Sequence, residues 1–244
     1  MNEVAIDFSK VHQIQVFGIT ILEPSTVISS LMMTVICIYA FVHLGKLGRA
    51  HRMYKQIQYF FFFMGIATAI GGVLGHGFLY LTGQPGKIPG WFASMIAVAL
   101  FERAAIWHIK PLLQKRSGLI LGWLNYVELA VFFALTFITL NFVVVEIHAF
   151  YGLFLMLFLI EIYVYRQRKD PGSINIFIAT ALGAVSAGLH ALKFSFGPWF
   201  NYNDISHISM GASIWFYYQG ARHMIYYGEE MIKPEEILES ENES

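Results

Sequence analysis

The 244-residue sequence is poor in cysteine and in charge. Its single cysteine, Cys37, lies within an apolar run, so no intramolecular disulfide can form. Charged residues make up only 13% of the chain, about half the fraction found in an ordinary soluble domain. Sixteen basic residues balance sixteen acidic ones, which leaves no broad basic surface for DNA or RNA. These shortages exclude a disulfide-stabilised fold and argue against a nucleic-acid partner.

Apolar residues take the place of the missing charge, at 57% of the chain with a mean hydropathy of +0.56. Seven apolar stretches have roughly twenty residues or more, the length at which a helix crosses about 30 Å of hydrocarbon. They are residues 25–45, 57–82, 91–110, 118–140, 143–165, 174–197 and 205–227. We therefore predict an all-α integral membrane protein, a bundle of seven transmembrane helices. The weakest break is at Asn141, where one long kinked span would leave six crossings.

Basic residues in the connections between the spans predict the orientation of the bundle. The second connection contains a single basic residue, Lys87, whereas the first, third and fifth each contain at least three. These are Lys46, Arg49, Arg52 and Lys55 in the first, Lys110, Lys115 and Arg116 in the third, and Arg166, Arg168 and Lys169 in the fifth. Because basic residues are retained on the cytoplasmic side, the odd-numbered connections should lie inside. The N-terminus is then outside and the C-terminus cytoplasmic, in the cell membrane or an organelle membrane.

The two ends of the chain differ in composition from the spans. Residues 1–24 lack the basic start and early apolar core of a cleavable signal, so we expect them to remain as an outer segment. Residues 25–228 would form the seven-helix domain. Residues 229–244 contain seven acidic residues and no aromatic residue, which is typical of a disordered cytoplasmic tail.

Ionisable residues near the outer ends of the spans are the first candidates for function, because burying them in hydrocarbon costs several kcal/mol unless they are paired or hydrated. His76, His190 and His207 should reach similar depth, and imidazole is a preferred ligand of zinc. We therefore predict that they hold a zinc ion. Asp204 shares a helical face with His207 and would act as a further ligand or as general base. Ser186, one turn before His190, would orient a bound water or a substrate oxygen.

A second polar group lies nearer the middle of the membrane, on spans three and four. It contains Glu102, Arg103, Asn125 and Glu128. Adjacent positions on a helix point to different faces, so Glu102 and Arg103 each need a partner of their own. We expect a structural ion pair or a link between the two spans. His148, at the start of span five, fits an interfacial or packed histidine best.

The last span, NDISHISMGASIWFYY, resembles the ending of the alkaline ceramidases, in which two histidines one turn apart precede small and aromatic residues. His76 in GGVLGHGF stands where that family has a histidine in span two, and His207 matches the second histidine of the last span. Glu23 in EPSTV is similar in position to an acidic residue before the first span. Together with the seven spans, these residues resemble the CREST superfamily, which includes alkaline ceramidases, Per1-like proteins and progestin and adipoQ receptors.

The resemblance implies a zinc ion that activates water to hydrolyse a lipid amide. Asn203 stands where the family has its other histidine, Gly72 where it has a serine, and span three contains no aspartate. His190 or Asp204 would then have to complete the ligand set, and Ser186 would supply the hydroxyl.

These observations predict a zinc-dependent membrane hydrolase whose lipid amide or ester substrate enters from the bilayer. A receptor or lipid-binding protein without catalysis is the alternative, because a non-catalytic relative would lose metal ligands first. A small transporter is a third possibility, since the mid-membrane polar group could extend a path inward. Metal stoichiometry separates the first two hypotheses.

Overall fold

The computed structural model describes residues 11–47 and 52–230, with side chains in the last helix as far as Met224. Most of these residues are helical, and six continuous helical segments are long and apolar enough to cross a membrane. They are Pro24–Lys46, Arg52–Gly77, Gln84–Leu112, Lys115–Thr139, Phe142–Arg168 and Pro171–Ala191. The prediction of an all-α, multi-pass membrane protein is thereby confirmed. The acidic tail predicted for residues 229–244 lies outside the described residues except for its first two.

The elements follow one another without large insertions. A hairpin of β1 (Gln13–Val16) and β2 (Ile19–Leu22) precedes the helices. The helices are α1 (Pro24–Lys46), α2 (Arg52–Gly72), α3 (Leu79–Thr82), α4 (Ile88–Ile109), α5 (Lys115–Thr139), α6 (Phe142–Ala149), α7 (Phe158–Arg168), α8 (Pro171–Ala191) and α9 (Tyr202–Glu230). Two π-helical segments, η2 (Val73–Gly77) and η5 (Phe150–Leu157), and two 3₁₀ segments, η3 (Gln84–Lys87) and η4 (Lys110–Leu112), complete the order.

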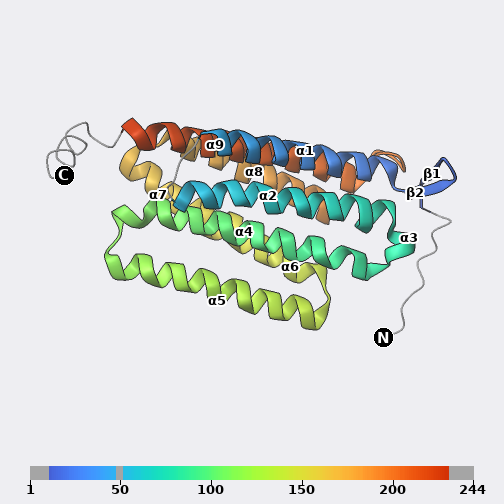
Figure 1. The fold of residues 1–244 in the computed structure, drawn as a ribbon, viewed down its shortest axis with the longest axis horizontal. Helices are drawn as coiled ribbons and strands as arrows, with labels where there is room; N and C mark the ends of the chain where they lie inside the picture. The colour runs from blue at the N-terminus through green and yellow to red at the C-terminus, as the bar shows by residue number, and fades with distance from the viewer. Residues whose placement is uncertain (1–10, 48–51, 231–244) are drawn as a thin grey trace.

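The hairpin occupies part of the outer segment predicted for residues 1–24. Its turn consists of Phe17 and Gly18, with φ of 52° and 79°. Positive φ at both central residues is the geometry that matches the twist of a two-residue hairpin. The hairpin lies at one end of the bundle, which we call the hairpin end (Figure 1).

The long helices run side by side along the bundle (Figure 1). The helix α9 packs against α8 and α1, α2 packs against α1 and α4, and α5 lies at the edge against α4 and α6. Of the most apolar part of each span, 61% is buried in Gln84–Leu112 but only 11% in Lys115–Thr139. Thus α4 is the central helix, whereas α5 presents most of its apolar surface outward.

The break at Asn141 is present in the structure. Helix α5 ends at Thr139, and Leu140 follows in the left-handed region with φ 48°. The Asn141 side chain then accepts a hydrogen bond from the backbone N–H of Val143, which caps α6. Spans four and five are therefore separate helices joined at the hairpin end (Figure 1).

The seventh predicted span, residues 205–227, falls within the 29-residue helix α9. This helix is not among the six segments that meet the length and apolarity expected of a crossing. Polar residues along it, including Asn203, Asp204, His207, Gln219 and Arg222, make it less apolar than the others. The sixth predicted span, residues 174–197, ends earlier than expected: α8 stops at Ala191, and residues 192–201 form an irregular connection.

Candidate functional site

Glu23 and His76 form the closest polar contact at the hairpin end. Nδ1 of His76 donates a hydrogen bond to Glu23 Oε2 at 2.6 Å, and both side chains are about one-fifth exposed. Glu23 precedes α1 and has left-handed backbone geometry, φ 41°, which is uncommon for a residue with a side chain. His76 lies in the π-helix η2. π-Helical turns occur frequently at functional sites, and such strain is a reason to suspect one.

The charge of Glu23 is stabilised by this contact. Burial by itself raises the pKa of the carboxyl, but the hydrogen bond from His76 and the nearby positive charges lower it, and the net pKa lies below the ordinary value. Glu23 therefore accepts from His76 as a carboxylate near neutral pH. This fixes the proton of His76 on Nδ1 and leaves Nε2 free to bind a ligand.

His207, on the first turns of α9, faces His76. Their ring centroids are 6.1 Å apart and the rings are nearly perpendicular. Nδ1 of His207 lies 3.0 Å from Ser29 Oγ and 3.2 Å from Ser30 Oγ, both on α1. As in His76, the side-chain partners of the ring lie at Nδ1, which leaves Nε2 without a side-chain partner and available to a ligand.

His190, near the end of α8, lies against a second acidic residue. Its Nδ1 is 3.4 Å from Glu146 Oε1 on α6, and the two side chains are 39% and 45% exposed. The ring also lies edge-on to Tyr202, with centroids 5.3 Å apart. Hence all three predicted zinc ligands hold Nδ1 against a carboxylate or hydroxyl, the arrangement usual for histidines that bind zinc through Nε2.

Asp204 caps α9. Its carboxylate accepts hydrogen bonds from Thr26 Oγ1 at 2.8 Å, Ser25 Oγ at 3.2 Å and the backbone N–H of Asn201 at 2.7 Å. The Asn201 side chain in turn accepts from the backbone N–H of Asn203, which completes a reciprocal capping box. Asp204 is 1% exposed, so its carboxylate has a structural use that competes with the predicted roles of ligand and general base.

Ser186 likewise has a partner within the bundle. Its hydroxyl donates to the backbone carbonyl of Ser206 at 2.7 Å, and the side chain is 3% exposed. The contact joins α8 to α9 one turn before His190 and next to His207 in the sequence. The predicted role of Ser186 in orienting a water or substrate stays a prediction. It would require the hydroxyl to give up its hydrogen bond to Ser206.

The structure therefore brings His76, His207 and Glu23 together and places His190 at the rim. Among the described residues, a group of three potential metal ligands with atoms within 4.8 Å of one another occurs elsewhere, at Glu102, Glu128 and His148. The three outer histidines do not meet that distance. Their chemistry fits zinc, with three imidazole nitrogens on separate helices, but their closure around an ion requires movement of side chains.

Several partner residues were not predicted. Ser25, Thr26, Ser29 and Ser30 form a polar stripe on the first turns of α1, and they hold both Asp204 and His207. Their spacing of three and four residues on an otherwise apolar span is the signal in the sequence that could have identified them. Small hydroxyl residues are common in helix interfaces, so the sequence does not show which helix they face.

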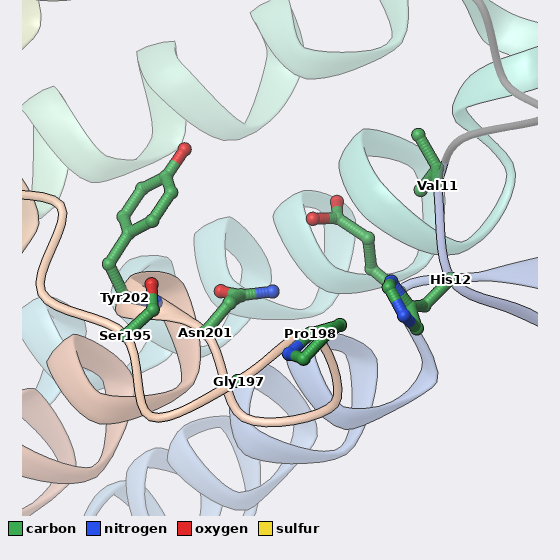
Figure 2. Close-up of a pocket in the computed structure, with 8 residues that line it drawn as sticks. Val11, His12, Ser195, Gly197, Pro198, Asn201 and Tyr202 are labelled. Carbon is green, nitrogen blue, oxygen red and sulfur yellow. The ribbon is translucent and has the colours of Figure 1, made fainter.

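A pocket of about 400 Å³ opens beside this cluster. It is lined by Val11, His12 and Glu23 on one side and by Ser195, Gly197, Pro198, Asn201 and Tyr202 on the other. Figure 2 shows the labelled side chains around it, from the segment before the hairpin, from the connection between α8 and α9, and from Tyr202 at the start of α9. Its volume lies within the range of small-molecule sites, and Glu23 connects it to His76.

Comparison with protein-family models gives one match, to a family described as being of unknown function, over residues 25–226. No curated protein and no solved structure matches the chain.

Proposed function

We propose that this chain, which belongs to the DUF6962 family of unknown function, is a zinc-dependent hydrolase that cleaves a lipid amide or ester at the outer end of the bundle. One observation carries the proposal: His76, His190 and His207 each have Nδ1 engaged by a neighbouring side chain, so that three Nε2 atoms from three helices remain available. The CREST-like pattern of the last span supports the same chemistry.

The proposal includes a seventh crossing by α9, with the hairpin end outside. Helix α9 runs beside α1 and α8 (Figure 1), as a spanning helix would. Basic residues next to the connections at the opposite end support a cytoplasmic location for that end, among them Lys46, Arg52, Lys115, Arg168 and Lys169. The cluster of histidines would then lie in the outer half of the membrane.

His76, His207 and His190 would hold the zinc ion, with Nδ1 kept in place by Glu23, by Ser29 and Ser30, and by Glu146 respectively. When bound, zinc would lower the pKa of a water to about 7 and polarise an acyl carbonyl. Two rings with centroids 6.1 Å apart can approach the Zn–N distance of about 2.0–2.1 Å with small side-chain rotations.

Glu23 is the best placed group to move a proton. It lines the pocket, it contacts His76, and its carboxylate is ionised near neutral pH because its pKa is lowered. Asp204 remains the competing candidate for general base, although three hydrogen bonds already occupy it. The polar side chains of His12, Asn201 and Tyr202 in the pocket lining would bind the head group of a lipid whose chains stay in the bilayer.

The test is the zinc content of the detergent-purified full chain, measured by elemental mass spectrometry after removal of metal-binding tags. The wild type and His207→Ala are compared, with His43→Ala as the matched control, since His43 pairs with Tyr218 away from the cluster. We expect His207→Ala to lose one zinc per chain and all hydrolysis of a panel of lipid amides and esters. Unchanged zinc content and turnover in His207→Ala would overturn the mechanism.

The second candidate is a receptor or lipid-binding protein without catalysis. The observation that favours it is the spacing of the three histidines, whose ligand atoms do not already lie within 4.8 Å of one another. In that case the pocket would bind a lipid and His76 and His207 would contact its polar group. Lipid binding that survives His207→Ala, with the same zinc content in both proteins and no hydrolysis by either, would support this function.

A further inference from the structure

Three ionisable side chains meet inside the bundle, between α4, α5 and α6, away from the outer histidines. They are Glu102, Glu128 and His148, and one potential ligand atom of each lies within 4.8 Å of the other two. Nε2 of His148 is 3.2 Å from Glu128 Oε1. Glu102 and His148 are 0% exposed. The sequence predicted a structural ion pair or a link between spans for the two glutamates, and an interfacial or packed position for His148.

The polar atoms of this group are buried without hydrogen bonds. Glu102 Oε1, both carboxylate oxygens of Glu128 and both ring nitrogens of His148 have no hydrogen-bond partner among the described residues. Although His148 approaches Glu128, the contact is not aligned as a hydrogen bond. A buried polar atom without a partner is rare and costly, and five of them on three side chains whose potential ligand atoms lie within 4.8 Å of one another indicate a ligand shared by these residues.

Neighbouring residues orient the group without completing it. Asn125 donates through Nδ2 to Glu102 Oε2 at 2.9 Å, which leaves Oε1 facing the cluster. Arg103 is directed away from both carboxylates: it donates to Asn125 Oδ1 at 2.8 and 3.0 Å and stacks on the Tyr126 ring at 3.3 Å. Asn125 therefore lies between the guanidinium of Arg103 and the carboxylate of Glu102.

The backbone of η5 makes room at the same place. Gly152 packs against Glu102, and a Cβ atom at this position would overlap Glu102 Oε1 and the Val98 side chain. The glycine lies in a π-helix, a form that is rare and frequent at functional sites. The segment therefore approaches the carboxylate more closely than a regular helix with side chains would.

We infer that Glu102, Glu128 and His148 form a second, inner site for a divalent transition-metal cation such as Zn²⁺ or Mn²⁺. Two carboxylates and one imidazole are suitable ligands for these ions, and a double positive charge balances two buried carboxylates. The ion would lie between the three potential ligand atoms, one from each residue, and a water would fill a remaining position. This inference does not rest on the proposed hydrolase, whose histidines lie at the outer end.

The consequence is structural. In the described part of the chain, α5 is the most exposed of the spans and packs mainly against α4 and α6. A cation shared by Glu102 of α4, Glu128 of α5 and His148 of α6 would fasten the outlying helix to the centre of the bundle. Chelation should then loosen α5 first.

The experiment uses the full chain in detergent, stripped with a chelator and dialysed against Zn²⁺ alone. The outer double variant His76→Ala/His207→Ala removes the proposed hydrolase site from the count. We expect it to retain one zinc per chain, and addition of Glu128→Gln or His148→Gln to abolish this zinc. Glu161→Gln is the matched control, because the carboxylate of Glu161 is buried but already paired with His108 and Ser173. An outer double variant without zinc, or a zinc that survives Glu128→Gln, overturns the inference.

A milder variant guards against misfolding. Asn125→Ala leaves all three ligands in place but removes the hydrogen bond that orients Glu102, and we expect the affinity for zinc to fall by about 10- to 100-fold. Cobalt substitution gives an independent reading, since its visible absorption should change in His148→Gln and not in Glu161→Gln. If the hydrolase proposal fails, zinc is lost only with the inner variants; if the inner site fails, zinc is lost only with the outer ones.

Discussion

The carboxylate of Glu23 contacts His76 of the bundle, and its ionisation gives the first prediction. Its pKa is lowered in the folded protein, so the unfolded chain binds more protons and the contact stabilises the fold above the ordinary glutamate pKa of about 4.3. That stability should be lost as the pH falls below this value. We expect wild type to melt above Glu23→Gln at pH 7 and the difference to shrink below about pH 4.3. Thermal unfolding in detergent measures it, and a difference that is constant from pH 7 to pH 3 would contradict the role of ionisation.

Substitutions of Asp204 distinguish a structural role of its carboxylate from a role in zinc binding or catalysis. If the carboxylate serves mainly to cap α9, Asp204→Ala should destabilise the protein by about 1–3 kcal/mol, because three donors lose a buried acceptor. Asp204→Asn keeps an acceptor oxygen and should cost less. The zinc content of the wild type should persist in both variants. Loss of one zinc in a folded Asp204→Asn would return this residue to the ligand set.

The sequence identified candidate functional residues more successfully than it predicted which side chains they contact. His76 and His207 were recognisable because a histidine in an apolar span needs a reason to be there. The structure then brought them within 6.1 Å of each other. The capping box was readable from Asn201 and Asp204, three residues apart at the start of a helix. The contacts of His148 with Glu102 and Glu128 were not, since they depend on which faces of three helices turn inward.

Among the elements, the turn between α5 and α6 carries measurable strain. Leu140 has φ 48°, in a left-handed region that costs a residue with a side chain roughly 1–2 kcal/mol and glycine almost nothing. We expect Leu140→Gly to raise thermal stability by about 1 kcal/mol, after the greater freedom of glycine in the unfolded chain is offset. Leu124→Gly, in the interior of α5, is the control and should be destabilising. Equal losses in both variants would argue that α5 continues through this position.

The lengths of the elements were predictable where composition changes sharply. The break at Asn141 follows from a polar cap between two apolar runs, and the structure confirms it. The early end of α8 and the two π-helices were not foreseen. Hydrophobic periodicity does not distinguish a π-turn from an α-turn over five to eight residues, and Phe194 and Phe196 look as apolar in a connection as in a span.

For the whole molecule, the number of crossings decides where each terminus lies. Seven spans place the hairpin and the C-terminus on opposite sides, and six place them on the same side. Phe17→Cys is fully exposed at the hairpin tip and Lys169→Cys lies between α7 and α8. The native Cys37 is 0% exposed and need not be removed. We expect an impermeant maleimide to label Phe17→Cys on intact cells, and Lys169→Cys and a C-terminal tag to be reached only after permeabilisation. A C-terminal tag accessible on intact cells would exclude the seventh crossing.

The membrane character of the molecule was evident from composition alone, and six of the seven predicted spans correspond to segments that are long and apolar enough to cross a membrane. The status of α9 could not be settled in this way, because the polar residues that make it interesting also reduce its apolarity. Asn203, Asp204 and His207 are tolerated there because α1 supplies hydroxyl partners. Hydropathy averages a helix over all its faces and does not register such pairing.

The π-helix η5 sets the angular relation between two halves of one span. His148 and Glu161 are thirteen residues apart on the continuous segment Phe142–Arg168. At about 100° per residue, a regular α-helix would place them about 140° apart around its axis. Both are nevertheless fully buried toward α4, where His148 meets Glu102 and Glu161 binds His108. The wider turns of η5 absorb the difference, so deleting one residue there would rotate one polar cluster out of phase with the other while the span kept its hydrophobic length.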